Sequence, residues 1–440
     1  PRLSESLRMK RRLLAVILLS SLPGAALGQT APNPTRTAWV QAVDGGGFEA
    51  RLLTTATTCP VMHTDGGDVA LRVRAAADDK FPLLCAAKVP AGTSAADIDG
   101  KPLPMPVADP RRILVIGDTG CRLKGATTQD CNTPQQWPFP QVAAAAAKLR
   151  PDLVIHVGDY LYRETPCPPG DAGCAGSPYG DNGPAWQADF FTPAGPLLSA
   201  APFVLARGNH EECAREGTGW LRLLGPLPHQ PGCLNHIPMF TVDVGKFRLA
   251  VMDDAGAPEM LVNKTGLPAY TADIAELGRI APPVWFVHHR PIWAAITGPL
   301  GIPVGGNRTL VQAAHDAAQA AGKDAPLIAP SVALQLSGHI HTFEAINYDR
   351  SVPPQIVAGN GGDLLNVTPK DLRGAIFQGS QTVRVTKGIS VGGFGFMLMT
   401  RAADGWGIDL FDSAGNPVRS CHFTAARDGG EGQVDCPESK

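Results

Sequence analysis

The stretches RILVIGDTG (112–120) and LVIHVGDYLY (153–162) set the fold class, because each joins a short apolar run to a glycine and an aspartate. An apolar run of this length that ends in a polar loop is typical of a short β-strand. The loop that follows such a strand is a common place for functional side chains. The pattern returns in PFVLARGNH (202–210), VWFVHHR (284–290) and ALQLSGHIH (333–341).

Helical segments separate these strands, so the order of elements predicts an α/β fold. Their alanine content or their apolar period favours helix. Helices are predicted at 141–149, 270–278 and 309–321. Two further strands are predicted at 247–253 and 355–360, and a hairpin with an Asp-Gly turn at 395–412.

The region before residue 111 has a different pattern. Residues 30–106 show strand-like alternation with glycine-rich turns, which predicts a small all-β domain. The proline-rich segment 101–110 predicts a stiff linker, because proline continues neither a helix nor a central strand. We therefore expect a catalytic domain at 111–415 and a short C-terminal tail at 416–440.

The N-terminus has the layout of a secretory signal. Met9 is a candidate start, with residues 1–8 ahead of it, and it precedes a basic triplet, an apolar run at 13–19 and small residues at 25–28. We expect a signal peptide within residues 1–28 and a secreted or periplasmic protein. A short buried helix or a retained anchor is the alternative, but the run is too short for a stable membrane span.

The ten cysteines fit an oxidising compartment, where spare thiols close loops. A cysteine-rich zinc site is the alternative, but the chain has no CxxC motif. Sequence does not fix the connectivity. Local pairing would give Cys59–Cys85, Cys121–Cys131, Cys167–Cys174, Cys213–Cys233 and Cys421–Cys436.

Composition bounds the partners of the chain. Its 440 residues are 44% hydrophobic and 18% charged, which is typical of a globular protein, and the formal net charge is −2. This balance lacks the basic footprint expected of a nucleic-acid-binding protein. We expect no nucleic-acid partner and no stable membrane anchor after signal cleavage, and the sequence leaves the oligomeric state open.

Carboxylate, amide and imidazole groups follow the five strands. A lone Gly-Asp or Gly-Asn-His is ordinary turn chemistry, and the histidines of GHIH could be polar residues at a strand end. Five such motifs in order, each at the end of an apolar strand, instead indicate a site for two adjacent cations. The candidate groups lie in GDTG (117–120), GDYLY (158–162), GNHE (208–211), HHRP (288–291) and GHIH (338–341).

This ordered set resembles the calcineurin-like metallophosphoesterase superfamily and, within it, the purple acid phosphatases. The superfamily begins with Asp-x-His, whereas this chain has Asp118 and then Gly120 in the histidine position. The purple acid phosphatase pattern Gly-Asp-x-x-Tyr supplies a tyrosine instead, and here Asp159 and Tyr162 match it. The resemblance covers residues 111–362 and implies a β-sandwich flanked by helices (αββα), preceded by the small all-β domain.

The resemblance also implies a ligand set. The first metal, a ferric ion, would be held by Asp118, Asp159, Tyr162 and His341. The second, divalent metal (Zn, Fe or Mn) would be held by Asp159 as the bridge and by Asn209, His289 and His339.

Three further assignments follow the family pattern. His289 is preferred to His288 as a ligand, because the family shape His-x-Pro matches His289 and Pro291. His210 is placed to protonate the leaving oxygen or to orient the phosphate; bonding to a neighbouring backbone group is the alternative. Arg290 is the candidate phosphate clamp, because residues 294–308 lack the histidine that relatives carry there.

The implied function is a secreted acid phosphatase that hydrolyses small phosphate monoesters with a metal-bound hydroxide. A phosphodiesterase or nucleotide hydrolase with the same centre is the first alternative, because the metals do not select the ester. A non-catalytic phosphate- or metal-binding protein is the second. The N-terminal β region is expected to act as a spacer or a dimer surface, and a carbohydrate-binding module is the alternative for it.

Overall fold

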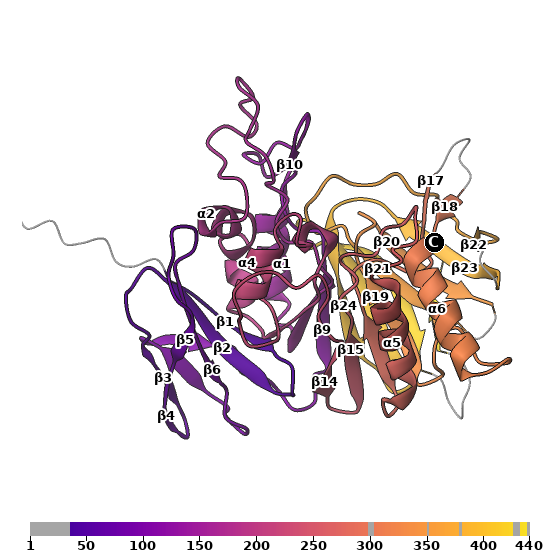
Figure 1. Cartoon of the computed structure of the whole chain (residues 1–440), viewed down its shortest axis with the longest axis horizontal. Coiled ribbons are helices and arrows are strands. Elements are labelled where there is room, and N and C mark those ends of the chain that lie inside the picture. Colours follow the sequence, from indigo (N-terminus) through magenta and orange to yellow (C-terminus); the bar gives the residue numbers. More distant parts are fainter. Residues whose placement is uncertain (1–35, 298–302, 350–351, 378–380, 426–431, 438–440) are drawn as a thin grey trace, which may run out of the picture. The chain divides into compact units, whose positions relative to one another are not determined.

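The computed structural model of the chain describes residues 36–297, 303–349, 352–377, 381–425 and 432–437. All of them belong to one compact unit, Thr35–Lys440 (Figure 1). The predicted signal segment 1–28 lies outside the described residues. No helix within the described ranges is long and apolar enough to cross a membrane.

Two large sheets dominate the described part of the chain. The first contains β1 (Arg36–Ala42), β2 (Phe48–Thr54), β5 (Arg72–Ala75), β6 (Leu83–Lys88), β9 (Arg112–Ile116), β12 (Leu153–His156), β13 (Phe203–Leu205), β24 (Gly395–Arg401), β25 (Gly405–Asp412), β26 (Pro417–Thr424) and β27 (Gln433–Asp435), in the order β27-β26-β25-β24-β9-β12-β13-β1-β2-β6-β5. The second contains β14 (Phe240–Val244), β15 (Phe247–Val251), β16 (Val284–Val287), β19 (Val332–Ser337), β20 (Phe343–Tyr348), β21 (Gln355–Ala358), β22 (Ile376–Phe377) and β23 (Val383–Val391), in the order β14-β15-β16-β19-β21-β20-β23-β22.

The two sheets pack face to face. Alternate side chains of each strand point to opposite faces of its sheet, so one set points toward the other sheet and the other set points outward. On β9, Ile113 and Val115 belong to the apolar layer between the sheets. Leu114 and Ile116 belong to the layer on the outer face. The apolar runs recognised in the sequence are therefore strands buried on both sides.

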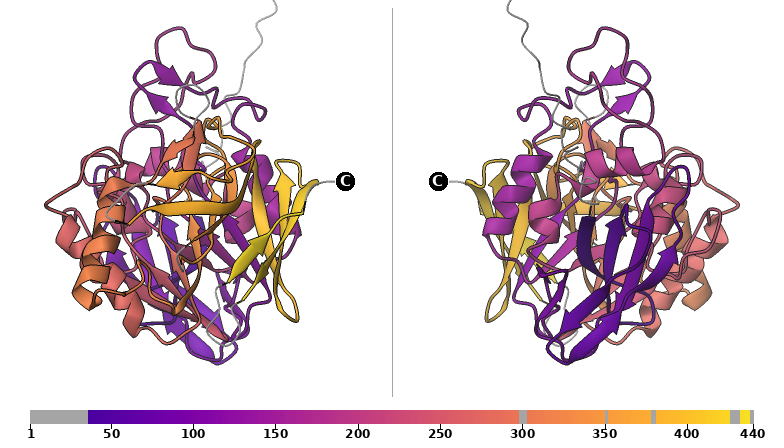
Figure 2. Two further views of the ribbon diagram at one scale, coloured as in Figure 1. Left: turned by 90° about the vertical axis from the view of Figure 1, so that its right-hand side faces the viewer. Right: turned by 90° about the vertical axis from the view of Figure 1, so that its left-hand side faces the viewer.

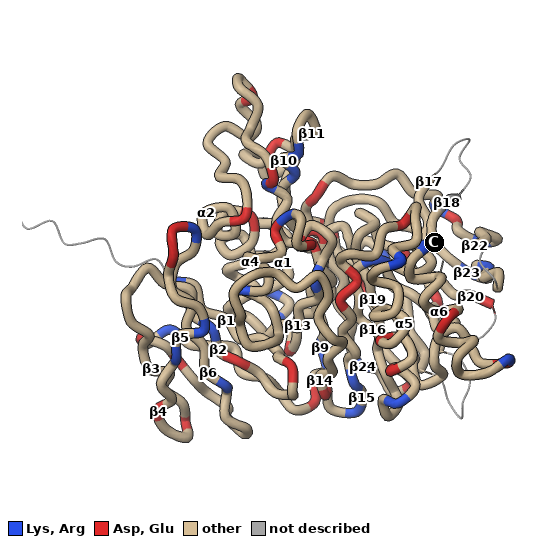
Figure 3. The backbone as a smooth tube through the Cα atoms, in the orientation of Figure 1, with Lys and Arg blue, Asp and Glu red and all other residues tan. Residues whose placement is uncertain are grey.

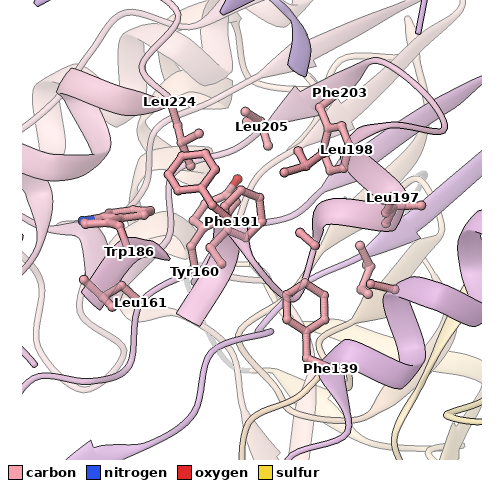
Figure 4. Packing of buried hydrophobic residues seen from close by; sticks show 14 of the residues in the cluster. Phe139, Tyr160, Leu161, Trp186, Phe191, Leu197, Leu198, Phe203, Leu205 and Leu224 are labelled. Carbon is pink, nitrogen blue, oxygen red and sulfur yellow. The ribbon is translucent and has the colours of Figure 1, made fainter. Parts of the chain in front are cut away.

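Helices cover the outer faces of both sheets. On the first sheet these are α1 (Phe139–Lys148), α2 (Gly183–Trp186), α3 (Gly195–Leu198) and α4 (Gly217–Leu223), and their apolar side chains share one core with the strands (Figure 4). On the second sheet these are α5 (Leu267–Glu276) and α6 (Arg308–Ala321), which lie side by side in Figures 1 and 2. The predicted αββα arrangement is confirmed.

The predicted helices and strands from residue 111 onward occur close to their predicted positions. At the start of α6, for example, the side chain of Asn307 accepts a hydrogen bond from the Leu310 amide and caps the helix. A local signal of this kind sets where the helix begins. The four-residue helices α2 and α3, and the π-helix η1 (Gln187–Phe191), were not predicted. They are too short to show an apolar period.

The N-terminal all-β region is present, and its strands appear in indigo in the right-hand view of Figure 2. It adds a small sheet of β3 (Val61–Thr64), β4 (Gly67–Ala70), β7 (Ala96–Ile98) and β8 (Lys101–Leu103), packed on β1 and β2. The parallel pairing of β1 with β13, at Gln41 and Phe203, joins this region to the first large sheet. Whether residue 106 bounds an independent domain stays a prediction.

The C-terminal segment also joins the first sheet, because β25 pairs with β26 and β26 with β27. The ten cysteines form the five sequential pairs expected from local pairing, including Cys421–Cys436 between these last strands. Acidic and basic residues are interspersed along the described part of the chain (Figure 3).

Candidate metal centre

The predicted site residues follow the carboxyl ends of parallel strands from both sheets. In the first sheet, β12 lies parallel to β9 and to β13. In the second sheet, β16 lies parallel to β19. Because the sheets face each other, the loops after these five strands meet at one end of the sandwich. The structure brings together Asp118, Asp159, Tyr162, Asn209, His289, His339 and His341.

The first cluster surrounds the phenol oxygen of Tyr162. This atom lies 2.8 Å from Asp159 Oδ2, 3.1 Å from Asp118 Oδ1 and 3.2 Å from His341 Nε2. All four side chains are buried. The phenol therefore points at the predicted partners of a first metal.

The second cluster surrounds the amide oxygen of Asn209. This atom lies 2.7 Å from His339 Nδ1 and 2.9 Å from His289 Nε2. His289 Nε2 also lies 3.2 Å from Asp159 Oδ2. The Asp159 carboxylate thus borders both clusters, as a bridging ligand would.

The outer nitrogen of each ligand imidazole is already used. His289 Nδ1 lies 2.8 Å from the Val157 carbonyl, and His341 Nδ1 lies 2.6 Å from the Leu364 carbonyl. His339 Nε2 lies 2.9 Å from Glu259. These acceptors fix the ring protons on the outer nitrogens, so the inner lone pairs of neutral rings face the carboxylate, amide and phenol oxygens. The Asn209 amide can also turn its nitrogen toward the two rings and donate to them at the same distances, whereas with its oxygen inward the cluster presents only acceptors and fits a cation.

The pKa shifts agree with this demand for positive charge. Burial alone would lower the pKa of His289, but the Asp159 carboxylate raises it to about 10. Burial would likewise lower the pKa of His341, but Asp363 and Asp118 raise it to about 9. Burial and the two ligand carboxylates raise the pKa of Tyr162 well above its ordinary value. Hard oxygen donors with imidazoles suit Fe(III) and a borderline divalent ion, so the residues present fit two cations.

Three candidate ligands have a left-handed backbone, with φ of +56° at Asp118, +58° at Asp159 and +68° at His339. Such values are uncommon outside glycine and concentrate at functional sites. After Asp159, the side chains of Tyr160 and Leu161 turn back into the core (Figure 4). The core thereby holds the strained aspartate toward the site.

Gly120 explains how the tyrosine reaches the first cluster. A Cβ atom at position 120 would lie 2.7 Å from Cδ2 of Tyr162 and 2.6 Å from Oδ2 of Asp189. The Tyr162 ring therefore occupies the space beside the position where the wider superfamily carries its histidine. A histidine at position 120 and the tyrosine at position 162 would therefore compete for the same space, and either of them would supply one ligand.

His210 lies against the site with its ring 3.7 Å from the Tyr162 ring, centroid to centroid. Its Nε2 lies 4.0 Å from Asp159 Oδ2. Its Nδ1 lies 2.6 Å from an Arg215 Nη atom and 3.0 Å from Glu164 Oε1, and Arg215 also pairs with Glu164. Burial lowers the pKa of His210 to about 3. Glu164, two residues after Tyr162, and Arg215 were not among the predicted site residues.

The phosphate-clamp role of Arg290 stays a prediction. Its guanidinium pairs with Glu259 and donates to the Ala255 carbonyl at 3.3 Å, and it is not among the residues that line the cavity at the site. Glu259 in turn accepts from His339. In this placement Arg290 and His339 share Glu259 as a partner.

His288 is fully buried and points away from the ligand cluster. Its Nδ1 lies 2.9 Å from the Arg290 carbonyl and 3.3 Å from Asp254. The structure therefore brings His289, and not His288, to the second cluster.

Three buried carboxylates hold the ligand loops by accepting backbone hydrogen bonds. Glu211 accepts from the amides of Tyr160 and Leu161, at 2.8 and 3.1 Å. Asp189 accepts from Tyr162 N at 2.8 Å, and Asp254 accepts from His289 N at 3.1 Å. Sequence reasoning missed these roles, because each joins segments that are far apart in the chain.

A cavity of about 1140 Å³ opens over the ligands. Asp159, Asn209, His339 and His341 line its inner part together with His210. Arg122 also lines it, pairing with Asp363 while its guanidinium carbon lies 5.0 Å from the centre of the Tyr162 ring. A substrate therefore has access to the ligand cluster beside a fixed positive charge.

Comparison with known proteins agrees with this geometry. The model of the calcineurin-like phosphoesterase family matches residues 111–343. A sequence comparison with curated proteins gives no match. Among solved structures, the chain is similar to a purple acid phosphatase from yellow lupin (Lupinus luteus) seeds, with a TM-score of 0.54 and 14% identity over 93% of this chain and 77% of that chain. It is also similar to a structure of PhoD, with a TM-score of 0.51 and 11% identity over 92% of each chain. At these identities the likeness shows the fold.

Proposed function

The chain belongs to the calcineurin-like phosphoesterase family, and from this premise we propose that it is an acid phosphatase that hydrolyses phosphate monoesters at a two-metal centre. Its activity as a metal-dependent hydrolase of phosphate esters follows from the family. The monoester preference, the metals and the individual residue roles are the proposal.

One observation carries the proposal: the Tyr162 phenol lies within 3.2 Å of Asp118, Asp159 and His341. These four side chains would hold Fe(III), and Asp159, Asn209, His289 and His339 would hold a divalent Zn, Fe or Mn ion. When bound, two such cations acidify a water molecule and neutralise the phosphate.

The chain's own residues position the substrate. Arg215 and Glu164 lie 2.6 and 3.0 Å from His210 Nδ1, and where this nitrogen accepts from Arg215 the ring proton of a neutral His210 is on Nε2, the nitrogen nearest Asp159. From there His210 would hydrogen-bond a phosphate oxygen or the leaving oxygen. Glu164 fixes Arg215 and so holds the imidazole in place. Arg122 on the cavity wall would attract the dianionic ester.

Export from the cytoplasm is part of the same proposal. The five disulfides support an oxidising compartment. A secreted or periplasmic phosphatase would release phosphate from small esters outside the cytoplasm.

The deciding experiment compares turnover of p-nitrophenyl phosphate with that of its bis ester, alongside metal analysis and a visible spectrum of the purified protein. We expect faster turnover of the monoester in mild acid, two metal ions per chain and a tyrosinate-to-iron absorption band. Faster turnover of the bis ester would favour the phosphodiesterase alternative. Two bound metals without turnover from about pH 4 to 8 would favour a binding protein.

A further inference from the structure

The cavity over the metal ligands is far larger than a phosphate group needs. A volume of about 1140 Å³ is slightly above the range of roughly 300–1,000 Å³ for sites that enclose whole drug-sized ligands. The ligand cluster accounts for one part of its wall, and the rest must contact the organic part of the ester.

That remaining wall contains an apolar part beside polar and charged residues. We call this part the apolar annex, and its members are Met260, Val262, Pro291, Ala294, Ile296, Val311, Ile340, Ile376 and Phe377. Phe377 is the only Phe, Tyr or Trp among the described lining residues. Nucleobases usually stack on aromatic rings, so this wall fits an alkyl or acyl chain better than a base.

Two polar lining residues next to the annex, Asn307 and Gln312, are bonded within the protein. Asn307 donates to the Ala257 carbonyl and accepts from the Leu310 amide. Gln312 donates to Asp316 at 2.8 Å. Lys124, Arg308 and His315 line the cavity as well, so the annex is the apolar part of a mixed wall.

Exposed apolar residues occur among the lining residues and next to them in the chain. Twelve large hydrophobic residues are exposed on the described part of the chain, and six of them lie on a lining residue or within two positions of one. Exposed apolar residues that gather around one opening mark a binding surface, whereas scattered ones need no explanation. We call these six the apolar rim: Met260, Leu261, Ile296, Leu364, Val367 and Ile376.

Hydrogen bonds tie the rim to the metal ligands. His341 donates its backbone amide to Asn366 Oδ1 at 2.8 Å, and Asn366 donates back to the His341 carbonyl at 3.0 Å. The next residue, Val367, accepts from Thr297 in β17 (Ala295–Thr297), which pairs with β18 (Pro303–Gly305). The apolar surface is therefore held at a fixed place beside the ligand cluster.

We propose that the site takes phosphate esters of chain-bearing aliphatic alcohols, with the phosphate at the ligand cluster and the chain along the apolar annex and rim. This inference rests on the proposed phosphatase function and names its substrate class. Such an ester is amphiphilic, and the cavity pairs a charged end with an aliphatic end in the same way.

The test measures binding of n-alkylphosphonates, which cannot be hydrolysed, to the purified metal-loaded protein by calorimetry. Complete burial of a methylene strengthens binding by about fourfold. For partial burial we expect Kd to fall by about threefold per methylene, on the order of 80-fold from butyl- to octylphosphonate. A Kd that does not change with chain length would overturn the inference.

A pair of variants tests where the alkyl chain of the ligand binds. Met260 and Ile376 are 72% and 44% exposed, so the double variant Met260→Ser/Ile376→Ser should keep its fold and lose most of the chain-length dependence. Val418→Ser, at a 48% exposed position on β26 away from the lining residues, should keep the wild-type dependence. Equal dependence in both variants would remove the rim from the site.

Turnover separates the inference from the function on which it rests. If the purified metal-loaded protein neither turns over p-nitrophenyl phosphate nor binds methylphosphonate, the phosphatase proposal itself is overturned. Turnover of ethyl and octyl phosphate with equal kcat/KM would leave the phosphatase standing and overturn the chain preference. If octyl phosphate is preferred in solution, the substrate is a free amphiphile; if phosphatidic acid in phosphatidylcholine vesicles is preferred, it is a membrane lipid. Either preference supports the inference.

Discussion

Gly120→Ala tests the spatial exchange between position 120 and the Tyr162 ring. The new methyl carbon would meet Asp189 Oδ2 at 2.6 Å, and both the Tyr160 carbonyl and Tyr162 Cδ2 at 2.7 Å. Ordinary contact begins at 3.4 Å, so these neighbours must move by about 0.7 Å. Two neighbours in the loop after β12 and one in η1 surround the methyl group and leave it little room.

The Tyr162 ring is the neighbour most able to move. The Tyr160 carbonyl is backbone, and Asp189 is held by Arg163 and by the Cys121 amide. A ring shift of 0.7 Å is large against the tolerance of about 0.2 Å for metal-ligand distances. We expect overpacking to cost about 1–3 kcal/mol of unfolding free energy, together with a weaker or shifted visible band.

Denaturant unfolding, metal analysis and the visible spectrum measure these effects. Gly195→Ala is the control, because a Cβ there meets nothing within 4 Å, and it should change stability by less than about 0.5 kcal/mol. If Gly120→Ala matched this control in stability, colour and metal content, the packing of Tyr162 against Gly120 would not hold its phenol in place.

Four further changes probe the centre. Tyr162→Phe should abolish the visible band while far-ultraviolet circular dichroism stays unchanged, and an unchanged band would remove iron from the assignment. Asp159→Ala should leave fewer than one metal ion per chain by elemental analysis, because its carboxylate borders both clusters. His210→Ala should keep both metals and lower kcat by about 10²–10⁴-fold, and loss of metal would make it a structural residue. Removal of metal by chelation should lower the Tm in calorimetry, because the inward-facing lone pairs lose the charge that holds them together, and an equal Tm would argue against a metal-coupled fold.

The candidate ligands could be predicted because they follow strands with a strong local signal. The strand before Asp118 is apolar on both faces, and the carboxyl ends of parallel strands converge in this fold whatever the loops contain. The five ordered motifs therefore indicated the candidate ligands, and the family resemblance assigned them to two metals, without any knowledge of the loops' conformations.

Other features depend on contacts between distant segments, and the sequence does not display them. The β1–β13 pairing joins residues 41 and 203, and the sequence of neither strand indicates which strand it pairs with. Asp189 lies in a π-helix without an apolar period, and its function is to accept the Tyr162 amide. Arg290 follows a motif that suggested phosphate binding, but its partner Glu259 lies in a loop whose path could not be predicted.

The centre joins the two sheets through its supporting hydrogen bonds as well as through its ligands. His289 follows β16 of the second sheet, yet its outer nitrogen donates to Val157, which follows β12 of the first. Asp118 follows β9 of the first sheet and accepts the His339 amide from the loop after β19 of the second, at 2.9 Å. The apolar layer between the sheets sets their separation, and these polar bonds set the register of the two ligand halves. A ligand set divided between two packed sheets keeps its geometry only if both the separation of the sheets and the register of the two halves are kept. Substitutions deep in the apolar layer should therefore weaken metal binding although they change no ligand.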